Sequence, residues 1–179
     1  MLNALARARA WLASRVALAT DTEPEQAGLR LVIGAGVFTY LSVTAGFDRA
    51  EDDSLNTWNL AFMIAFVTWT WALGAWIVWR PRTSRARRVA GLTGDLTATS
   101  YGLYAMGLLG APLTTLYLWV PIANGFRFGI GYLYGGTALA ALEFGIVLNT
   151  SPFWLAHWPF GVSILIGLIV LPLYVARLL

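Results

Sequence analysis

The sequence contains no lysine and no cysteine, and His157 is its single histidine. Without lysine, a Schiff base to retinal cannot form. Without cysteine and with one histidine, the chain lacks the ligands of iron–sulfur clusters, of a haem held by two histidines and of the usual zinc sites. The sequence therefore predicts no cofactor and no metal site, and it argues against an electron-transfer membrane domain.

Charged residues are also scarce, at 12% of the 179 residues, whereas hydrophobic residues make up 58%. The mean hydropathy is +0.66. These values lie outside the range of soluble domains and predict one domain with much of its apolar surface facing lipid. Nine tryptophans suit a membrane protein, because the indole ring favours the headgroup layer. The arginines lie at the ends of apolar segments, so the net charge of +3 does not indicate a nucleic-acid partner.

The first 26 residues do not have the pattern of a signal peptide. The uncharged run between Arg9 and Arg15 is too short for the hydrophobic part of such a peptide. The acid-free start, rich in arginine and alanine, also has the composition of a transit peptide. We favour a short helix in the membrane interface, anchored by Trp11, within a juxtamembrane segment 1–26.

Apolar segments of roughly 20 residues, the length that crosses a bilayer, occupy the rest of the chain. Four are clear, at residues 27–47, 57–79, 128–148 and 159–176. The stretch 89–126 is too long for one crossing and slightly short for two, and Gly110 and Pro112 predict a turn inside it. It divides into a span 89–109 and a short or re-entrant segment 112–124. The predicted fold is an all-α, polytopic transmembrane bundle of five or six spans.

The arginines favour six spans with a cytoplasmic N-terminus, because cytoplasmic loops are enriched in basic residues. All arginines except Arg49 then lie on the cytoplasmic side, including the five of "RPRTSRARR" at 80–88. Five spans with an external N-terminus would turn this loop outward and the acidic loop "DRAEDD" inward. The short segment with Pro121 leaves that alternative open. In both cases the C-terminus is cytoplasmic, and "VARLL" is where a linker to a cytoplasmic domain would begin.

Charged and amide groups within apolar segments are the candidate functional residues, because such groups are costly in a membrane. Arg127 with Asn124 could bind a carboxylate or phosphate, or Arg127 could be a boundary charge that extends to the headgroups. We expect Asp95 to pair with Arg127. Glu143 has no evident partner, and with Asp95 it is interpreted as an intramembrane polar or transmission residue. No catalytic constellation is visible, so this chain is not expected to be an enzyme by itself.

Two further patterns have alternative interpretations. In "DTEPEQ", residues 21–26, Thr22 and Glu25 have the spacing of a helix-capping box, although the cluster could also recognise the head of an amphipathic ligand. The spacing of Gly125 with Gly129, and of Gly131 with Gly135, predicts close helix packing.

Several short motifs occur together in order: "DTEPEQ" followed by Arg30, "RPRTSRARR" leading to Asp95, "NGFRFG", "SPFW" and "PLY". On these motifs, residues 21–179 resemble the membrane sensor domain of the hybrid histidine kinases that detect diffusible signal factor, the RpfC type. This signal is a cis-2-unsaturated fatty acid of bacterial quorum sensing. The resemblance implies a multi-pass domain of the bacterial inner membrane that controls a cytoplasmic kinase in a two-component system.

In this family the segment before the first span contacts the signal, which implies roles for Asp21, Thr22, Glu23 and Gln26. Pro24 and Glu25 depart from the family pattern. The family has five spans with an external N-terminus, in conflict with the arginine distribution. With the N-terminus outside, the acidic tip cannot pair with an ionised carboxylate, so it would hydrogen-bond to a protonated one or act through its backbone donors. With the N-terminus inside, a signal would enter from the bilayer and place its carboxylate on Arg127 and Asn124.

The predicted function is therefore a membrane receptor for a small lipophilic signal that regulates a cytoplasmic histidine kinase, as a homodimer in the lipid bilayer and without nucleic acid. One alternative is the membrane anchor of a nucleotide cyclase. The other is a small transporter or channel subunit that uses Asp95 and Glu143, although the internal repeat typical of transporters is not visible.

Overall fold

The computed structural model describes residues 22–47 and 53–178, together with residues 6, 7, 10, 11 and 14. Within this part all regular secondary structure is helical, which confirms the predicted fold class. The interfacial helix expected in segment 1–26 lies almost entirely outside the described residues, and so does Asp21. Trp11, its expected anchor, is exposed.

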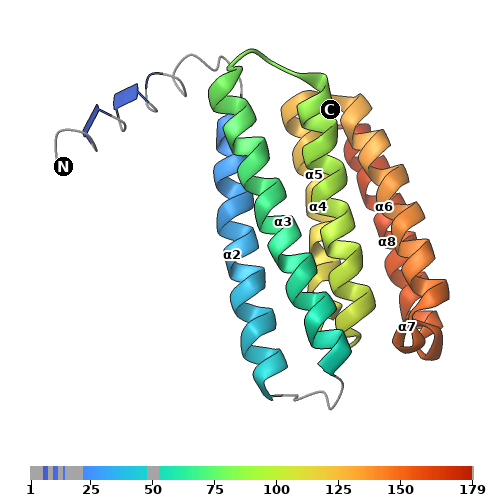
Figure 1. The fold of residues 1–179 in the computed structure, drawn as a ribbon. Coiled ribbons are helices and arrows are strands. Elements are labelled where there is room, and N and C mark those ends of the chain that lie inside the picture. Colours follow the sequence, from blue (N-terminus) through green and yellow to red (C-terminus); the bar gives the residue numbers. More distant parts are fainter. Residues whose placement is uncertain (1–5, 8–9, 12–13, 15–21, 48–52, 179) are drawn as a thin grey trace.

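Six long helices of the described part run alternately up and down (Figure 1). Two short elements accompany them: a 3-10 turn η1 (Ala111–Leu113) precedes α5, and α7 (Pro152–Ala156) connects α6 to α8. The long helices are α2 (Glu23–Phe47), α3 (Asp53–Trp79), α4 (Arg85–Met106), α5 (Thr114–Phe128), α6 (Ile130–Thr150) and α8 (Trp158–Ala176).

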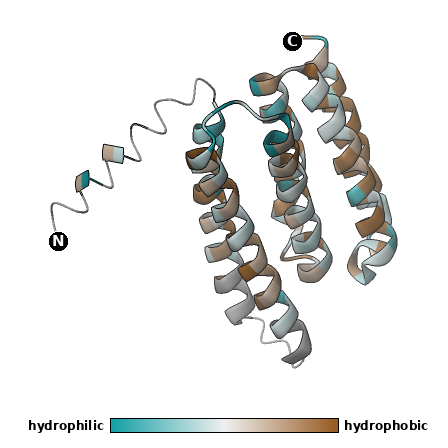
Figure 2. Ribbon diagram, turned by 45° about the horizontal axis from the view of Figure 1, so that its top comes forward, coloured by the Kyte–Doolittle hydropathy of each residue, from teal (hydrophilic) through white to brown (hydrophobic). Residues whose placement is uncertain are grey.

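The alternation brings the start of α2, the α3–α4 loop and the end of α8 to one end of the bundle (Figure 1). We call it the basic end, because it carries Arg80, Arg82, Arg85, Arg87, Arg88, Arg127 and Arg177. The hydrophilic α3–α4 loop is visible against the more apolar helices in Figure 2. The described loops of the opposite end, 107–113 and 151–157, contain no arginine.

Three of the described helices are long and apolar enough to cross a membrane, over Thr57–Trp79, Ile130–Thr150 and Trp158–Ala176. Helices α2 and α4 have the length but carry charged residues, among them Arg30 and Asp95. Helix α5 has 15 residues, or roughly 22 Å at 1.5 Å per residue, which is shorter than the hydrocarbon thickness of about 30 Å.

The apolar core lies between α4, α5, α6 and α8. Trp154 of α7 is completely buried there and donates a hydrogen bond from Nε1 to the Leu103 carbonyl at 3.1 Å. Its ring meets Phe144 edge-on at 5.3 Å, and Phe144 meets Tyr117 at 5.6 Å. These edge-to-face contacts connect the "SPFW" turn to the middle of the bundle.

Small residues let some helices approach closely, although not all those predicted. A Cβ added at Gly125 would lie 2.7 Å from the Leu133 Cβ, so this glycine allows α5 to pack against α6. Gly129, with φ of +99°, forms the turn between these helices. The prediction for Gly131 and Gly135 is wrong within the described chain, because a Cβ at either would meet nothing within 4 Å.

Candidate functional site: a polar layer at the basic end

Helix α2 turns one polar face towards the rest of the bundle. Glu23, Gln26 and Arg30 are three and four residues apart, so they lie on the same side of the helix. Glu23 and Arg30 are buried, at 4% and 9% exposure. Each of the three contacts different residues on α4 or α5. We call these three residues, together with the side chains that they contact, the polar layer.

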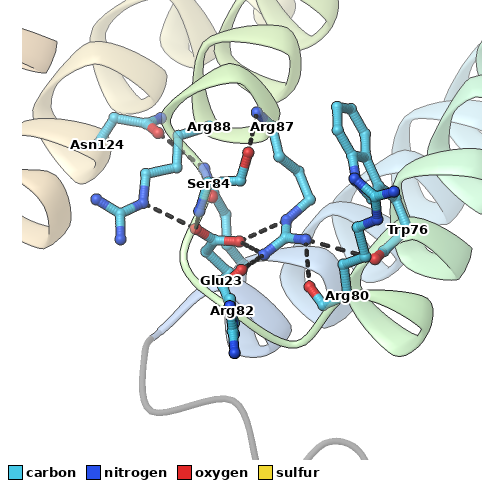
Figure 3. Close-up of polar contacts among 9 residues, drawn as sticks. Glu23, Trp76, Arg80, Arg82, Ser84, Arg87, Arg88 and Asn124 are labelled. Atoms are coloured by element: carbon cyan, nitrogen blue, oxygen red, sulfur yellow. Dashed lines mark hydrogen bonds and ion pairs between the residues drawn. The ribbon is translucent and has the colours of Figure 1, made fainter.

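Glu23 is held by the start of α4 (Figure 3). Its Oε2 accepts a hydrogen bond from Arg87 Nε at 2.5 Å, and its Oε1 accepts from Arg88 Nε at 2.9 Å and from the Ser84 backbone N–H at 3.2 Å. The Ser84 side chain caps α4 by accepting from the Arg87 backbone N–H. The Glu23 carboxylate therefore pins the first turn of α2 to the first turn of α4.

Arg87 also closes the α3–α4 loop. Its guanidinium donates to the carbonyl of Arg80 at 2.9 Å and to that of Arg82 at 2.8 Å (Figure 3). Arg87 is buried at 5% exposure, and a buried guanidinium is stable when its donors and its charge are all matched. The basic loop is thus organised around one internal arginine.

Gln26 connects α2 to α5. Its Nε2 donates to Asn124 Oδ1 at 2.8 Å, and Asn124 Nδ2 donates to the Val120 carbonyl at 2.7 Å. Asn124 is buried at 2% exposure. Its oxygen and one of its two amide N–H groups are therefore engaged within the bundle.

Arg30 forms a two-pronged ion pair with Asp95 of α4. Arg30 Nε lies 2.5 Å from Asp95 Oδ1, and Nη2 lies 2.7 Å from Oδ2. Gly91 makes the room, because a Cβ there would lie 2.6 Å from Arg30 Nη2. The expected pairing of Asp95 with Arg127 is wrong: Arg30 is closer, on the adjacent helix, and it satisfies both carboxylate oxygens.

Charged side chains of both signs meet in the polar layer. Two carboxylates, of Glu23 and Asp95, face three guanidinium groups, of Arg30, Arg87 and Arg88. The Arg88 guanidinium also lies over the Phe128 ring, 4.5 Å from its centroid, a cation–π contact at the end of α5.

Arg127 lies beyond the layer, one turn after Asn124 on α5. It is half-buried, and no carboxylate of the described residues pairs with it. A cavity of about 10 Å³ lies within the layer, lined by Glu23, Gln26, Arg30, Leu73, Ile77, Arg87 and Arg88. This is at the lower limit for one water molecule. The layer is therefore a packed joint between helices, and a larger ligand would have to bind at its edge or open it.

The sequence-predicted site residues are divided by the fold. Glu23, Gln26 and Asn124 come together, and Asp95 lies in the same layer. Thr22 is exposed, and its carbonyl accepts a hydrogen bond from the Gln26 N–H at 3.0 Å.

Glu143 lies apart from the polar layer, on α6, where it accepts from Thr97 Oγ1 at 2.9 Å and from Ser100 Oγ at 2.6 Å. The described residues contain no group of three or more His, Cys, Asp or Glu that could hold a metal ion.

The sequence did not indicate which side chains pair with one another in the polar layer. Arg30, Arg87 and Arg88 were interpreted only as charges that set the orientation in the membrane. The spacing of Glu23, Gln26 and Arg30 was a visible indication of one inward polar face, but it did not say which arginine meets which acid.

Comparison with known proteins agrees with the predicted resemblance. The chain is 32% identical over 170 residues to the sensory/regulatory protein RpfC in each of two strains of Xanthomonas campestris pv. campestris. The alignment covers 94% of this chain but only 23% of RpfC. No family model and no solved structure matches the chain. Over nearly its whole length the chain is therefore similar to one part of RpfC, in agreement with the resemblance that its motifs predicted.

Proposed function

We propose that this chain is the membrane sensor region of a histidine kinase and that it detects a small lipophilic signal of the cis-2-unsaturated fatty-acid type. The similarity extends over nearly all of this chain and over 23% of a sensory/regulatory protein. That extent matches an input region better than a complete signalling protein. The kinase, the signal and a dimeric assembly are parts of this proposal.

The orientation that we propose has six crossings, with the basic end in the cytoplasm. The alternating helix directions support an even number of crossings, because the start of α2 and the end of α8 lie at the same end (Figure 1). The concentration of arginine at that end supports a cytoplasmic location. The end of α8 would then lead directly to a cytoplasmic output region in the bacterial inner membrane.

The proposed ligand contacts are at the edge of the polar layer. The Glu23 carboxylate is already matched by Arg87 and Arg88, so it does not repel an anionic head, and its role is to position α2. No described carboxylate pairs with Arg127, and a guanidinium can bind a carboxylate through two parallel hydrogen bonds. A fatty-acid carboxylate would bind Arg127 in this way, with its chain in the bilayer, and Thr22 would lie on the α2 side.

The observation that carries the proposal is that Glu23, Gln26 and Arg30 join α2 to α4 and α5 through hydrogen bonds and ion pairs. A carboxylate that accepts the Gln26 Nε2 hydrogen bond in place of Asn124 Oδ1 would weaken this joint. Binding would then favour an arrangement in which α2 has shifted, because a ligand stabilises the state to which it binds more tightly. Helix α8 would transmit the change to the output region.

The test measures autophosphorylation of the full-length protein that carries this chain, reconstituted in lipid nanodiscs, against the concentration of a medium-chain cis-2-unsaturated fatty acid. Arg127→Gln should raise the half-maximal concentration by roughly tenfold or more, since a hydrogen bond to a charged group contributes about 1.5–3 kcal/mol. Arg85→Gln is the matched control, because Arg85 is an exposed arginine at the same end.

An unchanged response in Arg127→Gln, or the same loss in Arg85→Gln, would contradict the proposed contact. Absence of any response to the fatty acid in the wild-type protein would contradict the proposed signal class.

A further inference from the structure

A second polar cluster lies deep in the bundle, away from the basic end. The Glu143 carboxyl bridges Thr97 and Ser100 of α4, and Ser100 Oγ lies 2.5 Å from the Tyr117 hydroxyl of α5. None of the ion pairs among the described residues involves Glu143. The cluster is therefore a chain of hydrogen bonds without a compensating cation.

This cluster reaches the outer surface of the bundle. Thr97 is exposed and Glu143 is half-buried, whereas Tyr117 at the inner end is completely buried. Leu142 and Ile146, which flank Glu143 on α6, are exposed at 62% and 55%. An exposed face of this composition is one that meets lipid.

The depth makes such exposure costly. Glu143 follows the start of α6 at Ile130 by 13 residues, which is roughly 20 Å along the helix. Lipid tails at this depth offer no hydrogen bonds, so polar groups here normally have protein, water or ligand partners. A carboxylate has about four lone-pair sites, and the hydroxyl groups of Thr97 and Ser100 occupy two of those of Glu143.

We infer that Thr97, Glu143 and Ser100 form a lateral binding site for an uncharged amphiphile with a hydroxyl-bearing head, such as an alcohol or a protonated carboxylic acid. An anionic head is disfavoured because the cluster offers no cation, and any charged head is costly at this depth. A ligand hydroxyl would lie between the two side chains: it would accept the hydrogen bond that Thr97 Oγ1 now donates to Glu143 and would itself donate to Glu143, while the tail stays in the surrounding hydrocarbon.

The site is distinct from the proposed contacts at Arg127 and does not depend on them. Its inner end is connected to the core, because Tyr117 meets Phe144 and Phe144 meets Trp154 edge-on. A ligand bound at the lipid-facing surface is therefore connected, through these contacts, to the packing between α4, α5 and α6.

The experiment uses the full-length protein in nanodiscs and a photoreactive dodecanol with a diazirine in its tail, with labelled peptides located by mass spectrometry. We expect labelling of α4 and α6 around Thr97 and Glu143. Thr97→Val, which keeps the shape and removes the hydroxyl, should reduce this labelling by about three- to tenfold, the effect of one hydrogen bond. Thr93→Val is the matched control, because Thr93 is exposed one turn away on the same helix, and its labelling should be unchanged.

Glu143→Gln retains a hydrogen-bonding head without a charge and should keep most of the labelling. Complete loss in Glu143→Gln, with preferred labelling by the matching dodecylamine probe, would overturn the inference in favour of a cationic ligand. Equal labelling of wild type, Thr97→Val and Thr93→Val would overturn the inference, because it would show that the probe only partitions into the surrounding lipid. Absence of labelling, together with a disulfide between two copies of Thr93→Cys, would overturn it in favour of a second chain. Because the readout is labelling and not phosphorylation, failure here is distinguishable from failure of the proposed function.

Discussion

Replacement of Arg30 by methionine tests the joint between α2 and α4 most directly. It removes both hydrogen bonds to Asp95, whose side chain is only 16% exposed, and leaves that carboxylate buried without a cation. Breaking a buried ion pair by removing one partner costs about 3–5 kcal/mol. Polar pairs measured in membrane proteins tend to contribute less than in water-soluble ones, so we expect a loss of about 3 kcal/mol in the free energy of unfolding.

The double variant Arg30→Met/Asp95→Leu should recover most of this loss. Apolar residues of similar volume can replace a buried pair at little cost, so its stability should lie within about 1 kcal/mol of wild type. The assay is equilibrium unfolding in mixed micelles of mild detergent and dodecyl sulfate, followed by tryptophan fluorescence. The four proteins of the cycle yield the coupling energy between the two side chains.

Arg127→Met combined with Asp95→Leu is the control cycle, and it should show no coupling, because Arg30 and not Arg127 holds Asp95. A coupling energy below about 1 kcal/mol for Arg30 with Asp95 would refute the reasoning. So would coupling of Asp95 to Arg127 in place of Arg30.

Two further predictions concern the same region. Gly91→Ala should weaken the α2–α4 joint, because its Cβ would lie 2.6 Å from Arg30 Nη2. The free energy of unfolding should fall by about 1–3 kcal/mol, the cost typical of overpacking. Gly36→Ala should be neutral in the same assay, because a Cβ at this position meets nothing within 4 Å. The chain lacks cysteine, so Ser84→Cys and His157→Cys can be labelled singly with a membrane-impermeant maleimide. Ser84→Cys should react only after cell lysis and His157→Cys in intact cells, and the reverse pattern would contradict a cytoplasmic basic end.

The sequence by itself was sufficient for the helical membrane class. Its low content of charged residues and its long apolar runs do not suit a water-soluble domain, and in lipid a chain of this kind must satisfy its backbone hydrogen bonds within helices. Each predicted apolar segment overlaps one long helix of the structure, and the short segment 112–124 overlaps α5. The absence of lysine and cysteine was equally informative, because without these side chains the protein cannot form a Schiff base to retinal or bind an iron–sulfur cluster.

Local spacing also indicated part of the polar layer. Glu23, Gln26 and Arg30 share a helix face whatever the rest of the chain does, because the helical period sets it. Asn124 and Arg127 were recognisable as polar groups between apolar runs. What remained open was the partner of each group, because pairing depends on which helices lie side by side and in what register.

Only the tertiary structure decided those partners. Asp95 pairs with Arg30, and not with Arg127, because α2 lies beside α4 with Gly91 opposite the guanidinium. Gly131 and Gly135 have the spacing of a packing motif, but the fold turns them outward. Likewise, Glu143 meets Thr97 and Ser100 only because α6 packs along α4. The residues of these pairs are 43 to 65 positions apart in the sequence, and they come into contact through helix packing, which local sequence patterns do not encode.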